Sequence, residues 1–376
     1  MQALAFILYW NPRNIQSQAR QKLARRKIWS RPAARSGNAP TLADVAKLAG
    51  VSTATVSRCL NSPEQVVGDT RARVLKAVQD LGYTPNFGAR ILAAKRTKTI
   101  GAIIPTMENA IFARGIQAFQ EELREHGFTL LVASSSYQQS IEEEQIRTLT
   151  ARGADALLLI GHCRSPEIYR FLKSREVPVL VAWVFQAGNP QVSIGFDNRR
   201  AMGDLAREVI RSGHRRISYI SAETATNDRA SERIEGVRCA MSENGLDPED
   251  LVIFETTYSI ENGGNAFEQA MAAPVRPSVV MCGNDVLAAG ALLRARKLGL
   301  KVPRDVSITG FDDIELATLT DPALTTVHVP HRVMGRRAAQ MLIDMLNGDA
   351  EPESVELTAN LCLRETLAPP QFTADR

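Results

Sequence analysis

The chain has 376 residues, of which 44% are hydrophobic and 23% charged, and its 45 Lys and Arg residues against 41 Asp and Glu residues give a net charge of +4. This length predicts two or three folding units, and the composition excludes a disordered chain, a collagen-like repeat and a disulfide-stapled miniprotein. The five cysteines are scattered and form no C-x-x-C pair. That pattern is typical of a reducing cytoplasm and gives neither a zinc site nor a disulfide framework.

The charge is distributed unevenly along the chain. Residues 1–40 carry eight basic side chains and no acidic one, residues 41–99 carry a net charge of +5, and residues 100–376 carry a net charge of −9. A basic front on an acidic body predicts that only the front meets a polyanion. The apolar run at the start precedes its positive charges and is too short to span a bilayer, so we expect neither secretion nor a membrane partner. The first 40 residues are interpreted as a basic disordered arm or as a start site assigned too early.

Three short helices are predicted after Pro40. The first covers residues 42–49, the second runs from Thr53 to about Leu60, and the third covers residues 70–81. Their apolar residues recur three and four positions apart, and a glycine follows the first and the third helix.

The first two helices have the features of a helix-turn-helix. That motif needs a small residue at the helix crossing, a glycine in the turn and an apolar anchor on the second helix, and Ala46, Gly50 and Val56 supply them. Thr41 and Asp44 have the spacing of a capping box at the start of the first helix. The alternative is an ordinary small helical bundle with polar surface helices.

The second helix exposes short polar side chains and one arginine. Arg58 can bond guanine O6 and N7 together, and threonine and alanine methyl groups suit the thymine methyl group. The expected phosphate contacts, which position the domain without reading the base sequence, are Ser52, Thr55, Ser57 and Asn61.

The stretch TLADVAKLAGVSTATVSRCLN, continued by VVGDTRARVLKAVQDLGYTPN and ARILAAKRTKTIG, resembles the LacI/GalR family of bacterial transcription regulators. The resemblance extends from Thr41 to about Leu367. It implies that Thr53, Ala54 and Arg58 read bases in the major groove.

The resemblance also implies a hinge helix at about residues 86–95, which forms when a dimer binds its operator. Leu92 matches a leucine that the family inserts into the minor groove, where an apolar wedge kinks the duplex and admits further contacts. The candidate DNA contacts of this segment are Asn86, Arg90 and Leu92. Gly88 weakens intrinsic helicity, as expected of a hinge that folds only on DNA. The sequence departs from the family at Val67, where a serine usually caps the third helix, and in its extension before Thr41.

From Thr99 onward, short β-branched or leucine-rich runs alternate with amphipathic helical segments as far as the run VSITGFDD. This alternation predicts a mainly parallel sheet covered by helices, and its length favours two stacked α/β lobes. The predicted fold is therefore α/β, with an N-terminal all-α headpiece and a two-lobed core, and the family resemblance implies that this core is periplasmic-binding-protein-like. The expected parts are an extension (1–40), a helix-turn-helix domain (41–85), a hinge (86–98), an effector-binding and dimerisation core (99–368) and a tail (369–376).

Ligands of such cores sit between the lobes, at the carboxyl ends of parallel strands. By resemblance, the residues expected to line an effector cleft are Asn109, Phe112, Asp197, Arg233, Asn284 and Asp312. Asp and Asn can pair with sugar hydroxyls, Phe can stack on a sugar face, and Arg can grip a carboxylate or phosphate. The alternative for the Asn and Asp residues is that they only cap helices, Asn284 and Asp285 in particular.

Catalysis finds no support in the sequence. None of the five histidines stands in an H-E-x-x-H motif, and there is neither a G-x-S-x-G nucleophile elbow nor a Walker loop. His214, which follows a glycine at a helix end, is interpreted as a cationic partner of the helix dipole. We therefore expect no enzyme, no metal site and no cofactor.

The resulting hypothesis is a cytoplasmic, homodimeric repressor of a pseudo-palindromic operator in double-stranded DNA, controlled by a small carbohydrate-type effector. The phrases NSPEQV, NAIFARGIQ and IGFDNRRAM resemble the family branch that responds to gluconate-type sugar acids, and Arg233 would suit a carboxylate. Neutral sugars and sugar phosphates remain open, as does the choice between inducer and co-repressor. The alternatives are a periplasmic-type solute-binding protein, which the helix-turn-helix opposes, and a sugar-processing enzyme, which the missing motifs oppose.

Overall fold

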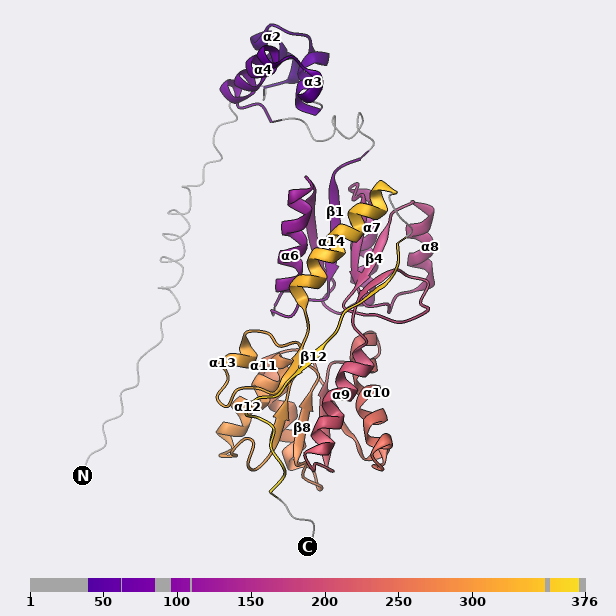
Figure 1. Cartoon of the computed structure of the whole chain (residues 1–376), viewed down its shortest axis with the longest axis vertical. Helices are drawn as coiled ribbons and strands as arrows, with labels where there is room; N and C mark the ends of the chain where they lie inside the picture. The colour runs from indigo at the N-terminus through magenta and orange to yellow at the C-terminus, as the bar shows by residue number, and fades with distance from the viewer. Residues whose placement is uncertain (1–39, 62, 85–95, 109, 349–351, 372–376) are drawn as a thin grey trace, which may run out of the picture. The chain divides into compact units, whose positions relative to one another are not determined.

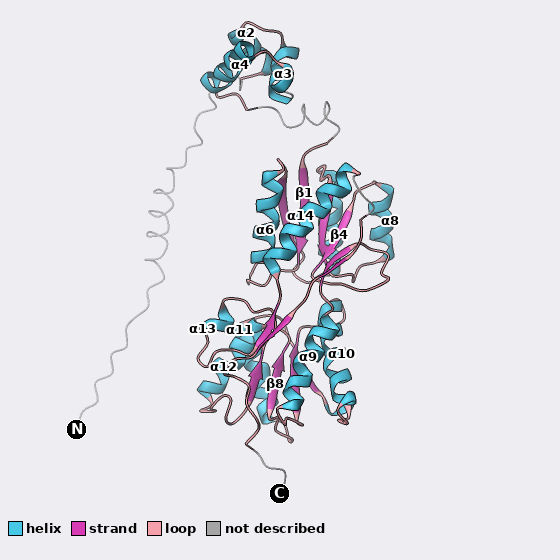
Figure 2. Ribbon diagram, viewed as in Figure 1, coloured by secondary structure: helices cyan, strands magenta, loops and turns pink. Residues whose placement is uncertain are grey.

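The computed structural model describes residues 40–61, 63–84, 96–108, 110–348 and 352–371. The chain divides into two compact units, the first ending at Ala93 and the second beginning at Ala94. Figures 1 and 2 show the first unit as a small helical domain and the second as two lobes, each with its own sheet.

The first unit consists of short helices around a small apolar core. Its elements are α2 (Leu42–Ala49), α3 (Thr53–Asn61), the 3-10 turn η1 (Pro63–Gln65) and α4 (Gly68–Leu81). The core is formed by Val45, Ala46, Ala49, Val56, Cys59, Val74 and Ala77. The Thr41 hydroxyl accepts a hydrogen bond from the Asp44 N–H, and the Asp44 carboxylate accepts one from the Thr41 N–H, which completes the predicted capping box.

The third helix of this unit begins two residues earlier than predicted, at Gly68. Its N-cap residue, Val67, makes no side-chain cap hydrogen bond and is 77% exposed. Asp69 supplies the negative charge of the first turn, which favours the helix dipole although no side chain caps the helix.

The upper lobe in Figure 1, called the N lobe here, has a six-stranded parallel sheet in the order β11-β5-β4-β3-β1-β2. Its strands are β1 (Thr99–Ile104), β2 (Thr129–Ser134), β3 (Ala156–Ile160), β4 (Val179–Ala182), β5 (Ser193–Gly195) and β11 (Val355–Glu356). Its helices are α6 (Ala113–Glu125), α7 (Gln139–Ala151), α8 (Pro166–Ser174) and α14 (His331–Asn347).

The other lobe, the C lobe, has a four-stranded parallel sheet in the order β7-β6-β8-β9. Its strands are β6 (Ile217–Ser221), β7 (Val252–Glu255), β8 (Val279–Cys282) and β9 (Ser307–Thr309). Its helices are α9 (Asn198–Arg211), α10 (Asp228–Glu243), η2 (Pro248–Asp250), α11 (Ile260–Ala272), α12 (Asp285–Lys297) and α13 (Leu316–Leu319).

The described chain passes between the lobes three times: from β5 to α9, from β10 (Thr326–His328) to α14, and from β11 to β12 (Asn360–Cys362). Strands β10 and β12 pair antiparallel, an exception to the expected parallel pattern. The sequence pattern assigned no element beyond residue 313, so α13, α14 and the strands β10, β11 and β12 were not predicted. These last strands have only two or three residues each, too few to show a periodicity.

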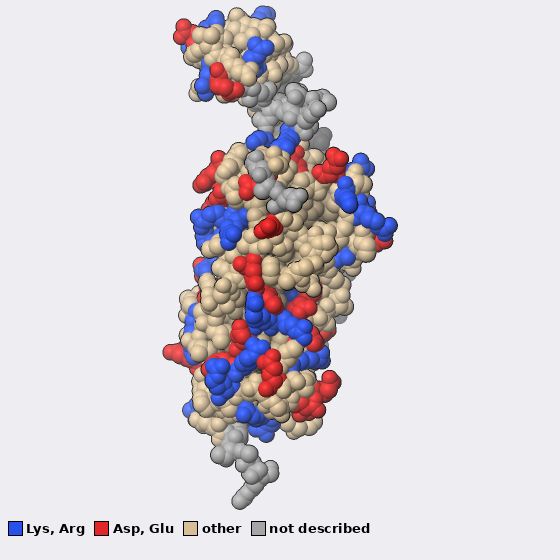
Figure 3. Space-filling view, turned by 45° about the vertical axis from the view of Figure 1, so that its right-hand side comes forward, with Lys and Arg blue, Asp and Glu red and all other residues tan. Residues whose placement is uncertain are grey.

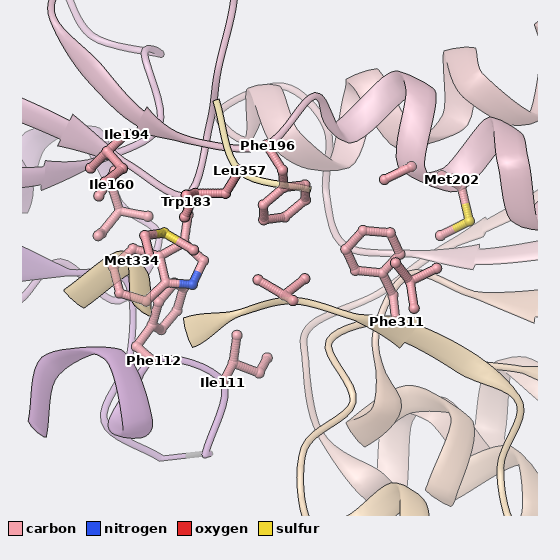
Figure 4. Packing of buried hydrophobic residues seen from close by; sticks show 14 of the residues in the cluster. Ile111, Phe112, Ile160, Trp183, Ile194, Phe196, Met202, Phe311, Met334 and Leu357 are labelled. Atoms are coloured by element: carbon pink, nitrogen blue, oxygen red, sulfur yellow. The ribbon is translucent and has the colours of Figure 1, made fainter. Parts of the chain in front are cut away.

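One apolar cluster continues from one lobe to the other. Figure 4 shows Phe112 beside Trp183 on the N-lobe side, and their ring centroids are 5.3 Å apart. Phe196, at the first crossing, lies next to Phe311 of the C lobe, with the two centroids 5.8 Å apart. Apolar burial therefore couples the lobes next to the chain crossings.

His214 corrects one interpretation made from the sequence. Its ring is buried and bonds through Nδ1 to the Ser278 hydroxyl and through Nε2 to the Ala368 carbonyl, each at 2.9 Å. Burial lowers the pKa of this histidine, which makes it a neutral internal link and not a cationic partner of a helix end.

The core has a net negative charge, and its charged side chains can be followed on one face of the molecule. On the face drawn in Figure 3, basic and acidic side chains are interspersed. Arg207, for example, pairs with Asp204 at 2.7 Å and with Glu243 at 2.8 Å. Among the described residues, no helix combines the length and the hydropathy needed to cross a membrane.

Candidate functional site

Helix α3 presents one polar face to solvent. Thr53, Ala54 and Arg58 are exposed, whereas Val56 and Cys59 point into the small core. Because Ala54 and Arg58 are four residues apart, they lie on the same side of the helix. The three residues expected to read bases are therefore accessible on the first turns of α3.

Ser52 holds the start of this helix. Its hydroxyl accepts a hydrogen bond from the Thr55 N–H at 3.1 Å and lies 2.9 Å from the Thr55 hydroxyl. Ser52 thus acts as an N-cap, and its hydroxyl is still exposed as a phosphate contact would require. Ser57 is half-buried. Asn61 ends α3, but its side chain lies outside the described residues, as do Asn86, Arg90, Leu92 and Asn109.

The core contains a cavity between its lobes, with about 330 Å³ of space between its walls. That space includes the opening to solvent, and the volume free for a water-sized molecule is only about 20 Å³, so a larger ligand requires the walls to move apart. The lining residues are Ile111, Phe112, Tyr137, Trp183, Phe196, Asn198, Asn227, Arg229, Arg233, Tyr258, Asn284 and Asp312. Four of the six residues expected to line an effector cleft, Phe112, Arg233, Asn284 and Asp312, are brought together here.

Arg233 is a buried cation on α10 that points at this cavity. Its guanidinium donates to the Asn198 side-chain oxygen and to the Tyr258 hydroxyl, both at 3.1 Å, and lies 4.8 Å from the Phe311 ring centroid. Its Nε–H is buried without a partner. No carboxylate of the described residues forms an ion pair with it, although buried charges normally have one.

Asn284 is both a helix cap and a cavity residue. Its side-chain oxygen accepts a hydrogen bond from the Leu287 N–H at 2.9 Å and caps α12. Its side-chain nitrogen is buried without a partner among the described residues. The two interpretations made from the sequence therefore do not exclude each other, since one end of the amide caps and the other can bind.

Asp312 follows β9 at the floor of the cavity, with a left-handed backbone φ of 104° and 4% exposure. Burial raises the pKa of its carboxyl, which the neighbouring guanidinium groups of Arg233 and Arg229 lower, and the result is a pKa of about 7. A group with that pKa can accept hydrogen bonds as a carboxylate or donate one as an acid at neutral pH.

Asp197 does not line the cavity. Its carboxylate folds back and accepts the Arg200 N–H at 2.9 Å, which caps α9, and it faces a separate surface pocket. Asn198, the next residue, lines the cavity instead and is held by the Trp183 carbonyl. The sequence reasoning also missed Trp183, Tyr137 and Tyr258, which lie just beyond the ends of β4, β2 and β7 in the structure.

Comparison with known proteins identifies the family to which this architecture belongs. Residues 41–86 match the bacterial regulatory proteins of the lacI family, and residues 206–367 match the periplasmic binding protein-like domain. The chain is 33% identical over 335 residues to the HTH-type transcriptional repressor PurR of Escherichia coli, an alignment that covers 88% of this chain and 98% of PurR. The chain belongs to the LacI family.

Solved structures agree with this assignment. The Lac repressor dimer bound to operator and the anti-inducer ONPF has a TM-score of 0.77 and 25% identity, covering 88% of this chain and 99% of that one. The complex of the regulator CelR with cellobiose has a TM-score of 0.65 and 28% identity, covering 87% and 99%. This LacI-family protein is accordingly a DNA-binding transcriptional repressor with a ligand-binding core. Because its relatives are repressors and not enzymes, the expectation that it is no enzyme is confirmed.

Proposed function

We propose that this LacI-family repressor binds a pseudo-palindromic operator as a cytoplasmic homodimer, and that a small acidic carbohydrate in the interlobe cavity sets its DNA affinity. The main support for an acidic effector comes from Arg233, a buried guanidinium with an unpartnered Nε–H and no ion pair among the described residues. A ligand carboxylate would complete its coordination, because a guanidinium binds a carboxylate through two parallel hydrogen bonds.

The rest of the cavity supports a polyhydroxylated body on that acid. The Asn284 amide nitrogen is a further unpartnered donor, and Asp312 and Asn227 add polar groups that can pair with hydroxyls. Phe112 and Trp183 supply apolar surface for a carbon skeleton. The relative CelR was solved with cellobiose, which agrees with a carbohydrate-type ligand.

For the headpiece, we infer that Thr53, Ala54 and Arg58 read base edges and that Ser52, Thr55, Ser57 and Asn61 contact phosphates. The hinge assignment of Asn86, Arg90 and Leu92 rests on the sequence resemblance. The effector would act through its different affinities for the DNA-bound and the free state, since only such a difference can shift the equilibrium between them.

The effector is tested by calorimetry of the full chain with gluconate, with glucose and with glucose 6-phosphate. We expect gluconate to bind and glucose to bind at least about tenfold more weakly, a difference of about 1.4 kcal/mol. Arg233→Gln should remove the preference for the acid. Equal binding of gluconate and glucose would contradict an acidic effector. Tighter binding of glucose 6-phosphate would mean that the acidic group of the effector is a phosphoryl group and not a carboxylate.

The DNA function is tested by selecting operators from random duplex DNA with the same protein. A two-fold symmetric motif is expected, because each protomer of a dimer offers one recognition helix to its half-site. Gluconate should then change the affinity of the selected operator, and the sign of the change distinguishes an inducer from a co-repressor. Enrichment of no symmetric motif would refute the proposed mode of binding.

A further inference from the structure

A second and larger chamber lies beside the effector cavity, across two tyrosines. Tyr137 follows β2 in the N lobe and Tyr258 follows β7 in the C lobe, and both residues line both spaces. Their ring centroids are 5.5 Å apart in an edge-to-face arrangement. The outer chamber has about 1390 Å³ of space between its walls, including its opening to solvent, against about 330 Å³ in the inner cavity.

The two spaces differ in charge. The inner cavity is lined by two arginines and one carboxyl group, that of Asp312, whereas the fourteen residues that line the outer chamber include no Lys, Arg or His and two glutamates, Glu108 and Glu223. An acidic group is therefore attracted to the inner cavity and repelled from the outer chamber.

The outer walls are rich in hydroxyl groups, since seven of the fourteen lining residues are Ser or Thr. Several of these hydroxyls are already bonded: the Ser259 hydroxyl caps α11, and the Thr226 hydroxyl donates to the Tyr137 carbonyl at 3.3 Å. The side chains of Thr256 and Gln138 have no hydrogen-bond partner among the described residues. Neutral donors and acceptors beside aromatic rings are suited to an uncharged polyhydroxylated ring.

The tyrosines connect the two spaces chemically. The Tyr258 hydroxyl accepts a hydrogen bond from Arg233 in the inner cavity, while the same residue borders the outer chamber. The two rings touch edge to face and separate the two spaces, so a ligand that extends from Arg233 into the outer chamber must move them apart and then lies against both rings.

We propose that the outer chamber is a second subsite that binds a neutral sugar ring linked to the acid held by Arg233. The effector is then a two-unit sugar acid, with the acid unit inside the pair Tyr137–Tyr258 and a glycosidically linked sugar outside it. This inference rests on the proposed acidic effector and narrows its size.

The test is calorimetry of the full chain with gluconate and with three two-unit acids, maltobionate, cellobionate and lactobionate. At least one two-unit acid is expected to bind about tenfold or more tightly than gluconate, because the second ring adds hydrogen bonds and aromatic contacts. If gluconate binds and none of the three binds more tightly, the second subsite is overturned. If all four acids fail to bind, the acidic effector itself is refuted.

A pair of matched variants tests whether the higher affinity for the two-unit acid comes from the outer chamber. Thr256→Val removes one hydroxyl from the outer wall at nearly constant volume, and it should weaken the preferred two-unit acid severalfold while leaving gluconate binding unchanged. Thr318→Val makes the same change on α13, outside both spaces, and should alter neither affinity. Arg233→Gln should weaken both acids. Unchanged binding of the two-unit acid to Thr256→Val, with gluconate binding intact, would place the second ring outside this chamber.

Discussion

The indole N–H of Trp183 donates a hydrogen bond of 3.1 Å to Nδ1 of His331. Because the indole can only donate, Nδ1 must accept, and the proton of the neutral ring sits on Nε2, which lies 3.2 Å from the Asp312 carbonyl. Trp183 follows β4 in the N lobe, His331 begins α14, and Asp312 belongs to the C lobe. One neutral imidazole thus links the two lobes at the wall of the effector cavity.

This link predicts a pH-dependent stability. Burial lowers the pKa of His331 from its ordinary 6.5 to about 4, so between these values the unfolded chain binds a proton that the folded chain does not. The free energy of unfolding should therefore fall by about 2 kcal/mol from this group between about pH 7 and about pH 5. Urea unfolding of the wild type and of His331→Phe at both pH values measures it.

The variant is the control for all other titrating groups, because they are the same in both proteins. Between about pH 7 and about pH 5, its free energy of unfolding should fall by about 2 kcal/mol less than that of the wild type. His331→Phe is expected to be less stable than the wild type at neutral pH, since the Trp183 N–H loses its acceptor. An identical pH dependence in both proteins would show that folding does not lower the pKa of His331.

The close crossing of α6 and α14 makes a second prediction. A methyl group on Gly335 would collide with the backbone of Gly115 on the facing helix, and backbone cannot move aside as a flexible side chain can. Gly335→Ala should therefore destabilise the core by about 1–3 kcal/mol, although alanine is the better helix former. Gly68→Ala, where the added methyl meets no atom within 4 Å, is the matched control and should not destabilise its helix. A Gly335→Ala protein as stable as the wild type would mean that the two helices can separate at low cost.

The headpiece could be predicted almost completely because its signals are local. The Thr41–Asp44 capping box, the left-handed Gly50 and Gly82 and the apolar spacing all act within a few residues. The parallel lobes were predictable for the same reason, since the helices have a local period and the buried central strands are short continuous runs of mostly apolar residues. The strands that cross between the lobes were not predicted, because such short strands are defined by partners far away in the sequence. Helix α14 was missed although its buried residues recur three and four positions apart.

The residues that line the effector cavity could be predicted from the sequence only in part. Asp197 and Asn198 both follow β5, and their roles depend on which of them is the first residue of α9. The N-cap Asp197 turns its carboxylate back to the helix, while Asn198 lies in the cavity. A shift of one residue exchanges the two roles, and boundaries of that precision depend on packing that composition does not encode. Tyr137 and Tyr258 were missed because only the folded lobes bring them together.

The raised pKa of Asp312 implies that binding of an acidic effector depends on pH. With a pKa of about 7, its carboxyl loses its proton as the pH rises, and the resulting carboxylate repels a ligand carboxylate held by Arg233. Gluconate affinity should therefore increase several-fold from about pH 8 to about pH 6, with proton uptake on binding. Calorimetry in buffers of different ionisation enthalpy measures both quantities. Asp312→Asn should abolish the proton uptake, and persistence of that uptake in the variant would assign it to another group.

Ser52 can be tested for its two roles separately. Ser52→Asp retains a side-chain oxygen for the N-cap and adds a negative charge that favours the helix N-terminus, so the stability of the headpiece should be maintained or slightly increased. If Ser52 also lies against a phosphate, the same carboxylate should lower operator affinity more than tenfold at low salt, and less at high salt. Thermal unfolding and DNA titration of this variant and of Ser52→Ala separate the two effects. Normal DNA affinity of Ser52→Asp would restrict Ser52 to capping.

Arg58 should contribute sequence discrimination, and not merely charge. Its side chain is exposed on α3 beside Ala54, on the face proposed to read bases. Arg58→Ala should cost about 1–3 kcal/mol on the selected operator and relax the preference at one base pair in each half-site. Lys76→Ala on α4 removes one exposed positive charge from the same unit and is the matched control. That control should at most weaken binding to all sequences equally, because a contact to phosphate carries no base information. If both variants lose the same affinity on specific and on random DNA, Arg58 contacts phosphate and another residue of α3 reads that base pair.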